Sequence, residues 1–183
     1  MARKERQTKQ RQAEVSLERV RTLGDPTLRQ QTHEITVFDS RVERLAKTML
    51  EVMRREDGIG LAATQIGVLS RVMVWRDPDD DSAEYVFVNP RIASRSEECT
   101  VAGEGCLSVP GCTVEVERAN EVMVAAQDLS GEPIEMEASG LVARIMQHEI
   151  DHLDGLLILD RATPEERRRA LKELRERALE TGS

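Results

Sequence analysis

The chain has 183 residues, of which 39% are hydrophobic and 33% charged. These proportions favour one compact domain over two domains or a disordered chain. With three Cys, one Trp, one Tyr and two Phe, the composition also excludes a disulfide scaffold and argues against a base-stacking surface for single-stranded nucleic acid.

The net charge of −8 is unevenly distributed. Residues 1–14 carry a net charge of +3 and residues 161–183 carry +2, so that residues 15–160 sum to −13. An acidic body argues against a DNA partner, whereas basic ends are compatible with local contact with RNA. No apolar run approaches the roughly 18 residues of a membrane span, and the N-terminus lacks the apolar stretch of a secretory signal. We therefore expect a cytoplasmic protein without DNA or membrane partners.

The N-terminal third of the chain is predicted to contain one helix. Residues 1–14 are polar and basic and are expected to form a mobile extension before a single domain over residues 15–183. Ser40 followed by Glu43 matches a capping box, and apolar residues then recur at helical spacing. This pattern predicts a helix over about 41–55, followed by a glycine-containing loop.

The centre of the chain is predicted to be rich in strands. An acidic turn separates two runs of β-forming residues, and further runs follow at short spacing. The expected strands are Val72–Trp75, Tyr85–Val88, Thr113–Arg118, Glu121–Gln127 and Ile134–Ala138.

The hydrophobic period changes after the last of these strands. Ser139 can cap a helix whose apolar residues cover most of its circumference and which ends near Gly155, so this helix is expected to be buried. Thr163 and Pro164 then open a helix that runs to about Leu179. The expected fold is α+β, with antiparallel strands packed around the central buried helix, plus an N-terminal and a C-terminal helix.

The buried helix carries the strongest chemical signal of the sequence. His148 and His152 are four residues apart, the spacing at which two imidazoles on one helical face can bind a single divalent ion. Glu149, next to the first histidine, can then reach a water at that ion. The alternative is a pair of core histidines, but burying two imidazoles and a carboxylate without a metal is costly.

An HExxH helix leaves the third ligand open, and thiolate, imidazole and carboxylate are all candidates. Cys106 lies in the best candidate segment, Glu104–Pro110, because Gly105 permits a close backbone approach. On composition alone, Cys99 and Cys112 compete with it. The loop Gly58–Gln65 can be interpreted by itself as a tight turn between helix and strand.

Three short sequence segments, taken together, form a pattern that is specific for one protein family. Gly58–Gln65 reads GIGLAATQ, Glu104–Ser108 reads EGCLS, and Gln147–Gly155 reads QHEIDHLDG. In this order the chain, from about Val20 to about Leu174, resembles the peptide deformylase family. The resemblance implies a metal-dependent hydrolase that removes the N-formyl group from the N-terminal formyl-methionine of newly made polypeptides and releases formate.

The resemblance also implies the roles of individual residues. Cys106, His148 and His152 would bind one divalent metal ion per chain, expected to be Fe²⁺ in the working enzyme, with Zn²⁺, Ni²⁺ or Co²⁺ able to replace it during purification. The residues expected to act on the reacting group are Glu149 as proton acceptor and donor, and the Gln65 amide and Leu107 backbone N–H as donors to the formyl oxygen. Substrate contacts are expected from Ile59, Gly60, Gly105 and Ile145.

Two other functions remain open at this point. An HExxH endopeptidase or aminopeptidase would use the same histidines and Glu149, and a non-catalytic ribosome-associated protein could share the fold. The basic C-terminal helix is explained either by solvated i,i+4 pairs, Glu165–Arg169 and Glu173–Arg177, or by contact with the ribosome. His33, Cys99 and Cys112 are given no function.

Overall fold

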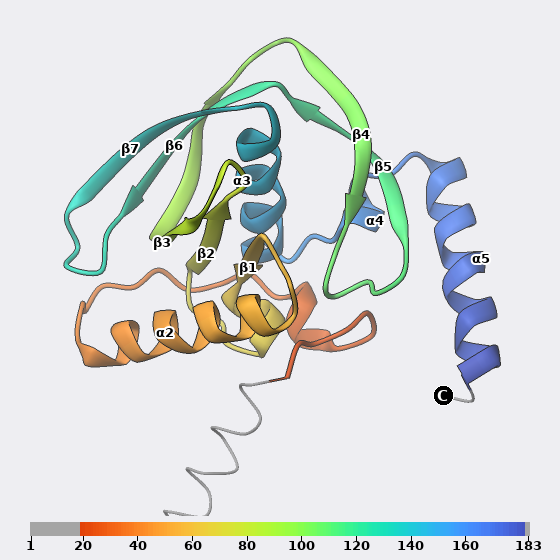
Figure 1. The fold of residues 1–183 in the computed structure, drawn as a ribbon, viewed down its shortest axis with the longest axis horizontal. Coiled ribbons are helices and arrows are strands. Elements are labelled where there is room, and N and C mark those ends of the chain that lie inside the picture. Colours follow the sequence, from red (N-terminus) through yellow and green to blue (C-terminus); the bar gives the residue numbers. More distant parts are fainter. Residues whose placement is uncertain (1–18, 182–183) are drawn as a thin grey trace, which may run out of the picture.

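The computed structural model describes residues 19–181 and shows an α+β fold in which every ladder between the named strands is antiparallel (Figure 1). This confirms the predicted fold class. The expected extension over residues 1–14 lies outside the described residues. No helix within residues 19–181 is long and apolar enough to cross a membrane.

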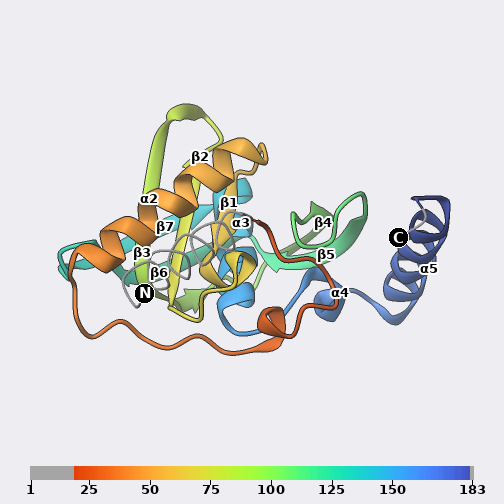
Figure 2. The same cartoon turned by 90° about the horizontal axis from the view of Figure 1, so that it is seen from below.

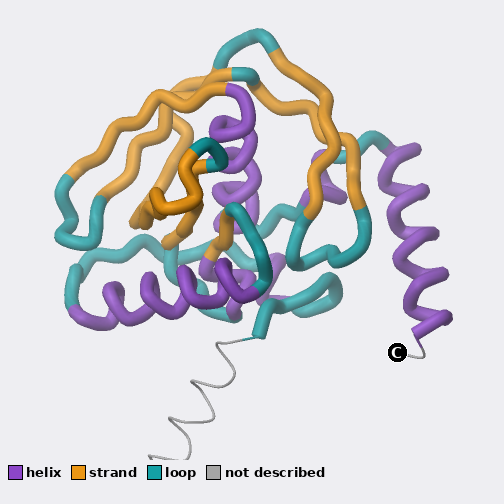
Figure 3. Tube along the Cα trace, viewed as in Figure 1, coloured by secondary structure: helices purple, strands orange, loops and turns teal. Residues whose placement is uncertain are grey.

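The helical elements are η1 (Pro26–Arg29), α2 (Ser40–Arg55), η2 (Ala63–Ile66), α3 (Gly140–Leu153), α4 (Ile158–Arg161) and α5 (Pro164–Thr181). The strands are β1 (Gly60–Ala62), β2 (Val72–Asp77), β3 (Asp80–Arg95), β4 (Cys99–Gly105), β5 (Thr113–Ala119), β6 (Glu121–Gln127) and β7 (Pro133–Ser139). They form a five-stranded sheet in the order β1-β2-β3-β6-β7 and a two-stranded sheet of β4 and β5 (Figures 1 and 3).

Two apolar layers cover the five-stranded sheet. On β2, Met73 and Trp75 belong to one buried cluster together with residues of α3, whereas Val72 and Val74 belong to another together with residues of α2. Successive side chains of a strand point to opposite faces of the sheet. Because both faces of β2 are covered, its sequence is a continuous apolar run. Helix α3 packs against β1, β2 and β7 and also contacts β5 of the smaller sheet (Figure 2).

The strands differ from the prediction where pairing partners determine their ends. β3 is far longer than Tyr85–Val88, because it continues through a register shift between Val88 and Arg91 and pairs first with β2 and then with β6. Asn89, in the left-handed region with φ of 53°, and Pro90 look like a strand break in the sequence but form this irregularity. β1 and β4 were not predicted as strands, since both are short or glycine-containing and depend on their partners.

The helix starts were predicted with one error. The N-cap of α2 is Asp39 and not Ser40, because the Asp39 Oδ1 atom accepts a hydrogen bond of 2.8 Å from the Arg41 N–H. Ser139 is the N-cap of α3, although its side chain makes no capping hydrogen bond. Thr163 caps α5 as expected, since its Oγ1 atom accepts from the Glu166 N–H at 3.2 Å.

Candidate active site

Helix α3 and the end of strand β4 bring one thiol and two imidazoles together. The Cys106 Sγ atom lies 3.2 Å from His152 Nε2, which lies 3.2 Å from His148 Nε2, and all three ligand atoms are within 4.8 Å of one another. A four-coordinate ion with bonds of about 2.0–2.3 Å holds its ligand atoms about 3.3–3.8 Å apart. The three atoms therefore fit a single metal ion. Cys99, by contrast, is exposed at the start of β4, and Cys112 packs with Val109 and Val114 in an apolar cluster and does not belong to the group of three ligand atoms.

The Cys106 thiol lies in an environment that favours its ionised form. Burial alone would raise its pKa, but the adjacent imidazoles of His152 and His148 hold the pKa of Cys106 well below its usual range. Because the thiolate is the form of cysteine that ligates a metal, this environment prepares the side chain for a cation.

A buried ionic network orients one of the histidines. Glu104 Oε2 lies 2.9 Å from His148 Nδ1, so the Nε2 atom of His148 is left facing Cys106 and His152. The Arg118 guanidinium donates to both Glu104 oxygens at 2.9 and 3.0 Å and to Asp151 at 2.5 Å. A carboxylate on the far nitrogen of a metal-binding histidine fixes its tautomer and ring orientation.

The network also sets the charge of Glu104. Burial raises the pKa of this carboxyl, but hydrogen bonds from His148 and Arg118 outweigh burial and lower the pKa to about 2. Glu104, Arg118 and Asp151 were given no positioning role from the sequence. A signal was present, because the alternation of β5 places Arg118 on the same face as the buried Val114 and Val116. A charged residue on an apolar face requires a buried partner.

Glu149 approaches the backbone of β1. A Cβ atom built on Gly60 would lie 2.4 Å from Glu149 Oε1, so a side chain at position 60 would occupy the space of the carboxylate. Glu149 is 4% exposed, and burial raises its pKa. Its Oε2 atom has no hydrogen-bond partner within residues 19–181. A buried carboxylate with a raised pKa and a free oxygen can accept and return a proton.

The Gln65 side chain is held at both ends. Its Oε1 atom accepts from the Ala62 N–H at 2.8 Å, and its Nε2 atom donates to Ser108 Oγ at 3.2 Å and lies 3.9 Å from Cys106 Sγ. The amide therefore points its N–H groups towards the thiol. The backbone N–H of Leu107 donates to no other backbone group in the described part of the chain. Both groups can donate to an oxygen of a bound ligand.

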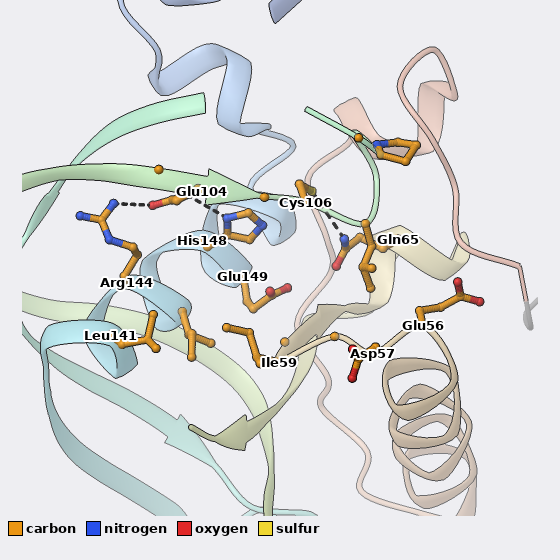
Figure 4. Close-up of a pocket in the computed structure, with 18 residues that line it drawn as sticks. Glu56, Asp57, Ile59, Gln65, Glu104, Cys106, Leu141, Arg144, His148 and Glu149 are labelled. Atoms are coloured by element: carbon orange, nitrogen blue, oxygen red, sulfur yellow. Dashed lines mark hydrogen bonds and ion pairs between the residues drawn. The ribbon is translucent and has the colours of Figure 1, made fainter. Parts of the chain in front are cut away.

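These side chains surround a cavity of about 610 Å³. In Figure 4, Glu149 projects from α3 between His148 and Gln65, and Ile59 and Leu141 lie to one side. All of the predicted site residues line the cavity except His152, which is 1% exposed and lies behind it. A Cβ atom on Gly105 would meet no atom within 4 Å, so the wall at that position is open.

Known proteins resemble this chain over most of its length. The sequence profile described as polypeptide deformylase matches residues 17–168. A peptide deformylase of Thermotoga neapolitana is 44% identical over 149 residues, covering 81% of this chain and 89% of the relative. Peptide deformylase 2 of Gloeobacter violaceus is 45% identical over 144 residues, which are 78% of this chain and 77% of that protein.

Solved structures agree in fold. The crystal structure of a peptide deformylase from Legionella pneumophila superposes with a TM-score of 0.83 at 37% identity, covering 90% of this chain and 96% of the other. A family profile and relatives of this identity and coverage are sufficient for assignment. This chain belongs to the polypeptide deformylase family of metal-dependent hydrolases.

Proposed function

We infer that this protein is a peptide deformylase, which hydrolyses the formamide of the N-terminal formyl-methionine of newly made polypeptides and releases formate. The observation that carries the inference is the convergence of the Cys106, His148 and His152 ligand atoms beside a cavity that Cys106, His148 and Glu149 line. We propose that residues 15–183 form one catalytic domain, that α3 is its central helix, and that the enzyme works in the cytoplasm.

The same three residues are proposed to hold one divalent ion, and their thiolate and imidazole ligands fit such an ion in type and spacing. When bound, a divalent ion would make water a stronger acid and polarise a carbonyl group. We propose Fe²⁺ as the working ion. We expect Zn²⁺, Ni²⁺ or Co²⁺ in some preparations, because each of these three ions binds such a site more tightly than Fe²⁺ does. Metal analysis after anaerobic purification, paired with activity, tests this assignment.

Glu149 is proposed to move the proton of the reaction. A C–O bond forms between water and the formyl carbon while the C–N bond breaks, so one proton must pass from the water to the departing amine. Glu149 is suited to both transfers, because its buried carboxyl has a raised pKa, its Oε2 atom is free of hydrogen bonds within residues 19–181, and its Oε1 atom lies against the backbone at Gly60.

Gln65 and Leu107 are proposed to stabilise the oxygen of the formyl group as it gains negative charge. The Gln65 amide is held by its bonds to Ala62 and Ser108, so it is fixed before substrate binds. The Leu107 N–H offers a second donor from the neighbouring loop. Donors fixed in advance need no reorganisation during the reaction, and losing one typically costs about 10²–10³-fold in rate.

The peptide itself is proposed to bind as an added strand. β1 lies at the edge of the five-stranded sheet, and its neighbour Ile59 together with Gly60 faces Gly105 at the end of β4 across the cavity. Main-chain pairing would accept many sequences after the first residue. Ile145, together with Leu141 on the same helix, would form the apolar wall that contacts the methionine side chain.

One assay separates this function from its rivals. Purified, metal-loaded protein is incubated with a formyl-methionine peptide, and formate release and internal cleavage are both measured. Formate release without internal cleavage is expected. Internal cleavage would favour an HExxH metallopeptidase, and neither product would favour a non-catalytic ribosome-associated protein. Glu149→Gln controls for formate released by contaminants.

The C-terminal helix α5 is proposed to contact the ribosome. Of the expected pairs along α5, Glu165–Arg169 is replaced, since Glu165 pairs with Arg168, and Arg169 pairs with Glu166 and Glu173. Ala170 is buried against the body, whereas Arg168 and Lys172 are strongly exposed on the outer face, where each pairs with an exposed glutamate, Glu165 or Glu176. The proposal rests on the small excess of basic over acidic residues in residues 161–183, which favours an RNA-rich partner.

Charge reversal tests the ribosome proposal without removing the helix. A triple change to Glu at Arg168, Lys172 and Arg175 should abolish co-sedimentation with ribosomes and leave formate release intact. The matched control reverses three exposed basic residues of α2, Arg41, Arg44 and Lys47. Equal co-sedimentation of both variants would contradict the proposal.

A further inference from the structure

A short segment before η1 joins two of the elements that carry the proposed oxygen-binding donors. The Arg21 N–H donates to the carbonyl oxygen of Gln65 at 2.6 Å, and the Leu23 N–H donates to the carbonyl oxygen of Ser108 at 2.8 Å. We call Arg21–Leu23 the strap, which is part of the red trace in Figures 1 and 2. It lies outside the sequence motifs and was given no function from the sequence.

The chain that follows the strap is anchored to the helix that carries both histidines. Thr32 donates from its N–H and from its Oγ1 to the Leu153 carbonyl oxygen, at 3.0 and 2.9 Å. A Cβ atom on Gly155 would lie 2.8 Å from the Arg29 carbonyl oxygen, so this contact depends on glycine. Leu28 of η1 is 1% exposed. One continuous segment thus contacts all three motif segments.

Apart from the strap, the two elements meet through side chains, since Leu107 packs against the apolar cluster that includes Ala63 and Ile66 of η2. Gln65 lies on η2, which is a single turn, and Ser108 lies in a loop after β4. The direct hydrogen bond between them runs from Gln65 Nε2 to Ser108 Oγ, and it uses the same amide group that is proposed to donate to the formyl oxygen. The two backbone hydrogen bonds of the strap do not depend on that amide, so they hold the two elements together whichever group the amide donates to.

We propose that the strap is a positioning element for the reaction, which fixes the Gln65 amide and the Leu107 N–H relative to each other. The inference rests on the proposed function of these two donors. Because donor geometry matters most where charge develops, displacement of the donors should lower kcat and leave substrate binding largely intact.

The position of Leu23 permits removal of one strap hydrogen bond without disturbing the local chain. The Asp25 N–H donates to the Thr22 carbonyl oxygen at 3.0 Å, and Gly24 has φ of 108°, so Thr22–Asp25 forms a turn with glycine at its third position. Proline is favoured at the second position of such a turn, which Leu23 occupies. Leu23→Pro therefore removes the N–H in a conformation that proline adopts readily.

The experiment compares Leu23→Pro with Leu23→Ala in the full, metal-loaded chain. Leu23→Ala keeps the N–H and removes a side chain that is 37% exposed. Formate release should give a kcat for Leu23→Pro about tenfold below that of Leu23→Ala, less than the loss of a whole donor. KM, metal content and the thermal midpoint should agree between the two variants within about twofold in KM and a few degrees in Tm.

Equal kcat values for the two variants would overturn the proposal. So would a fall in activity of Leu23→Pro that is explained by a lower metal content or by a higher KM. If the unaltered protein released no formate, the proposed function would fail first, and the strap inference with it. If Leu23→Pro does not fold, Gly24→Ala replaces it. A Cβ atom on residue 24 would meet no atom within 4 Å, so this substitution disturbs the strap only by straining the backbone at the positive φ of residue 24. A lower kcat at unchanged KM is again expected, and an unchanged kcat would overturn the proposal.

Discussion

Substitution of Gly60 by Ala tests the close approach between β1 and Glu149. The new Cβ atom would lie 2.4 Å from Glu149 Oε1 and 2.9 Å from its Cδ. Carbon and oxygen atoms do not approach closer than about 3.0 Å, so the carboxylate must retreat by about 0.6 Å or more. Glu149 is buried on a packed helix, and forced overpacking of this kind typically costs about 1–3 kcal/mol of stability.

The catalytic effect should exceed the effect on stability. Displacing a reacting group by about 1 Å can cost about 10²-fold in rate, so kcat for formate release should fall by about 10- to 100-fold. Metal content should stay the same, because Gly60 contacts none of the three ligands. The fall is measured by steady-state formate release, and the stability change by urea unfolding.

Gly105→Ala is the matched control, because its Cβ would meet no atom within 4 Å and faces the same cavity. It should leave the unfolding free energy unchanged and raise KM, since the methyl group occupies space proposed for the peptide. A kcat for Gly60→Ala within twofold of the unaltered enzyme would refute the reasoning about Glu149.

Three further predictions concern the metal site and its network. Glu149→Gln should retain the metal and lose most turnover, whereas Cys106→Ala should lose the metal first; metal analysis beside formate release checks both, and full turnover in Glu149→Gln would contradict the proposed proton carrier. Arg118→Met should destabilise the fold by about 1.5–3 kcal/mol in urea unfolding, because it removes the cation shared by Glu104 and Asp151, although Arg144 still pairs with Glu104 and Arg161 with Asp151; a loss below about 1 kcal/mol would show that the network is not tightly coupled. Glu104 has a folded pKa of about 2 against an ordinary value of 4.5, so its contribution to stability is present above pH 4.5 and is lost as the pH falls towards 2. The loss should be about 3 kcal/mol, measured by unfolding at successive pH values, and it should be absent in Glu104→Gln.

Local sequence patterns were sufficient for the three long helices and for the class of fold, but not for the short helix α4. α2, α3 and α5 follow from the spacing of apolar residues and from capping residues, which act within one or two turns of chain. The extent of β3 and the existence of β1 and β4 could not be predicted in this way, because strands end where their partners end. Asn89 and Pro90 would break an isolated strand, yet β3 continues past them through a register shift.

The metal site was accessible from the sequence in part. The spacing of His148 and His152 places both imidazoles on one helical face, so the prediction needs only helical geometry. The resemblance then pointed to Cys106 as the third ligand, and the structure places its thiol 3.2 Å from His152. The sequence shows that Arg118 falls on an apolar face of its strand and therefore needs a buried partner. It does not show which residues are the partners.

The sequence by itself determined the chemistry proposed for this protein, because side-chain type and helical spacing are local properties of the proposed site residues Cys106, His148, Glu149 and His152. Only the tertiary structure decided how that chemistry is arranged. Glu104 reaches His148, Gly60 meets Glu149, and the strap bridges Gln65 and Ser108 between residues far apart in the chain. Such contacts depend on how sheets and loops pack, which no local pattern encodes.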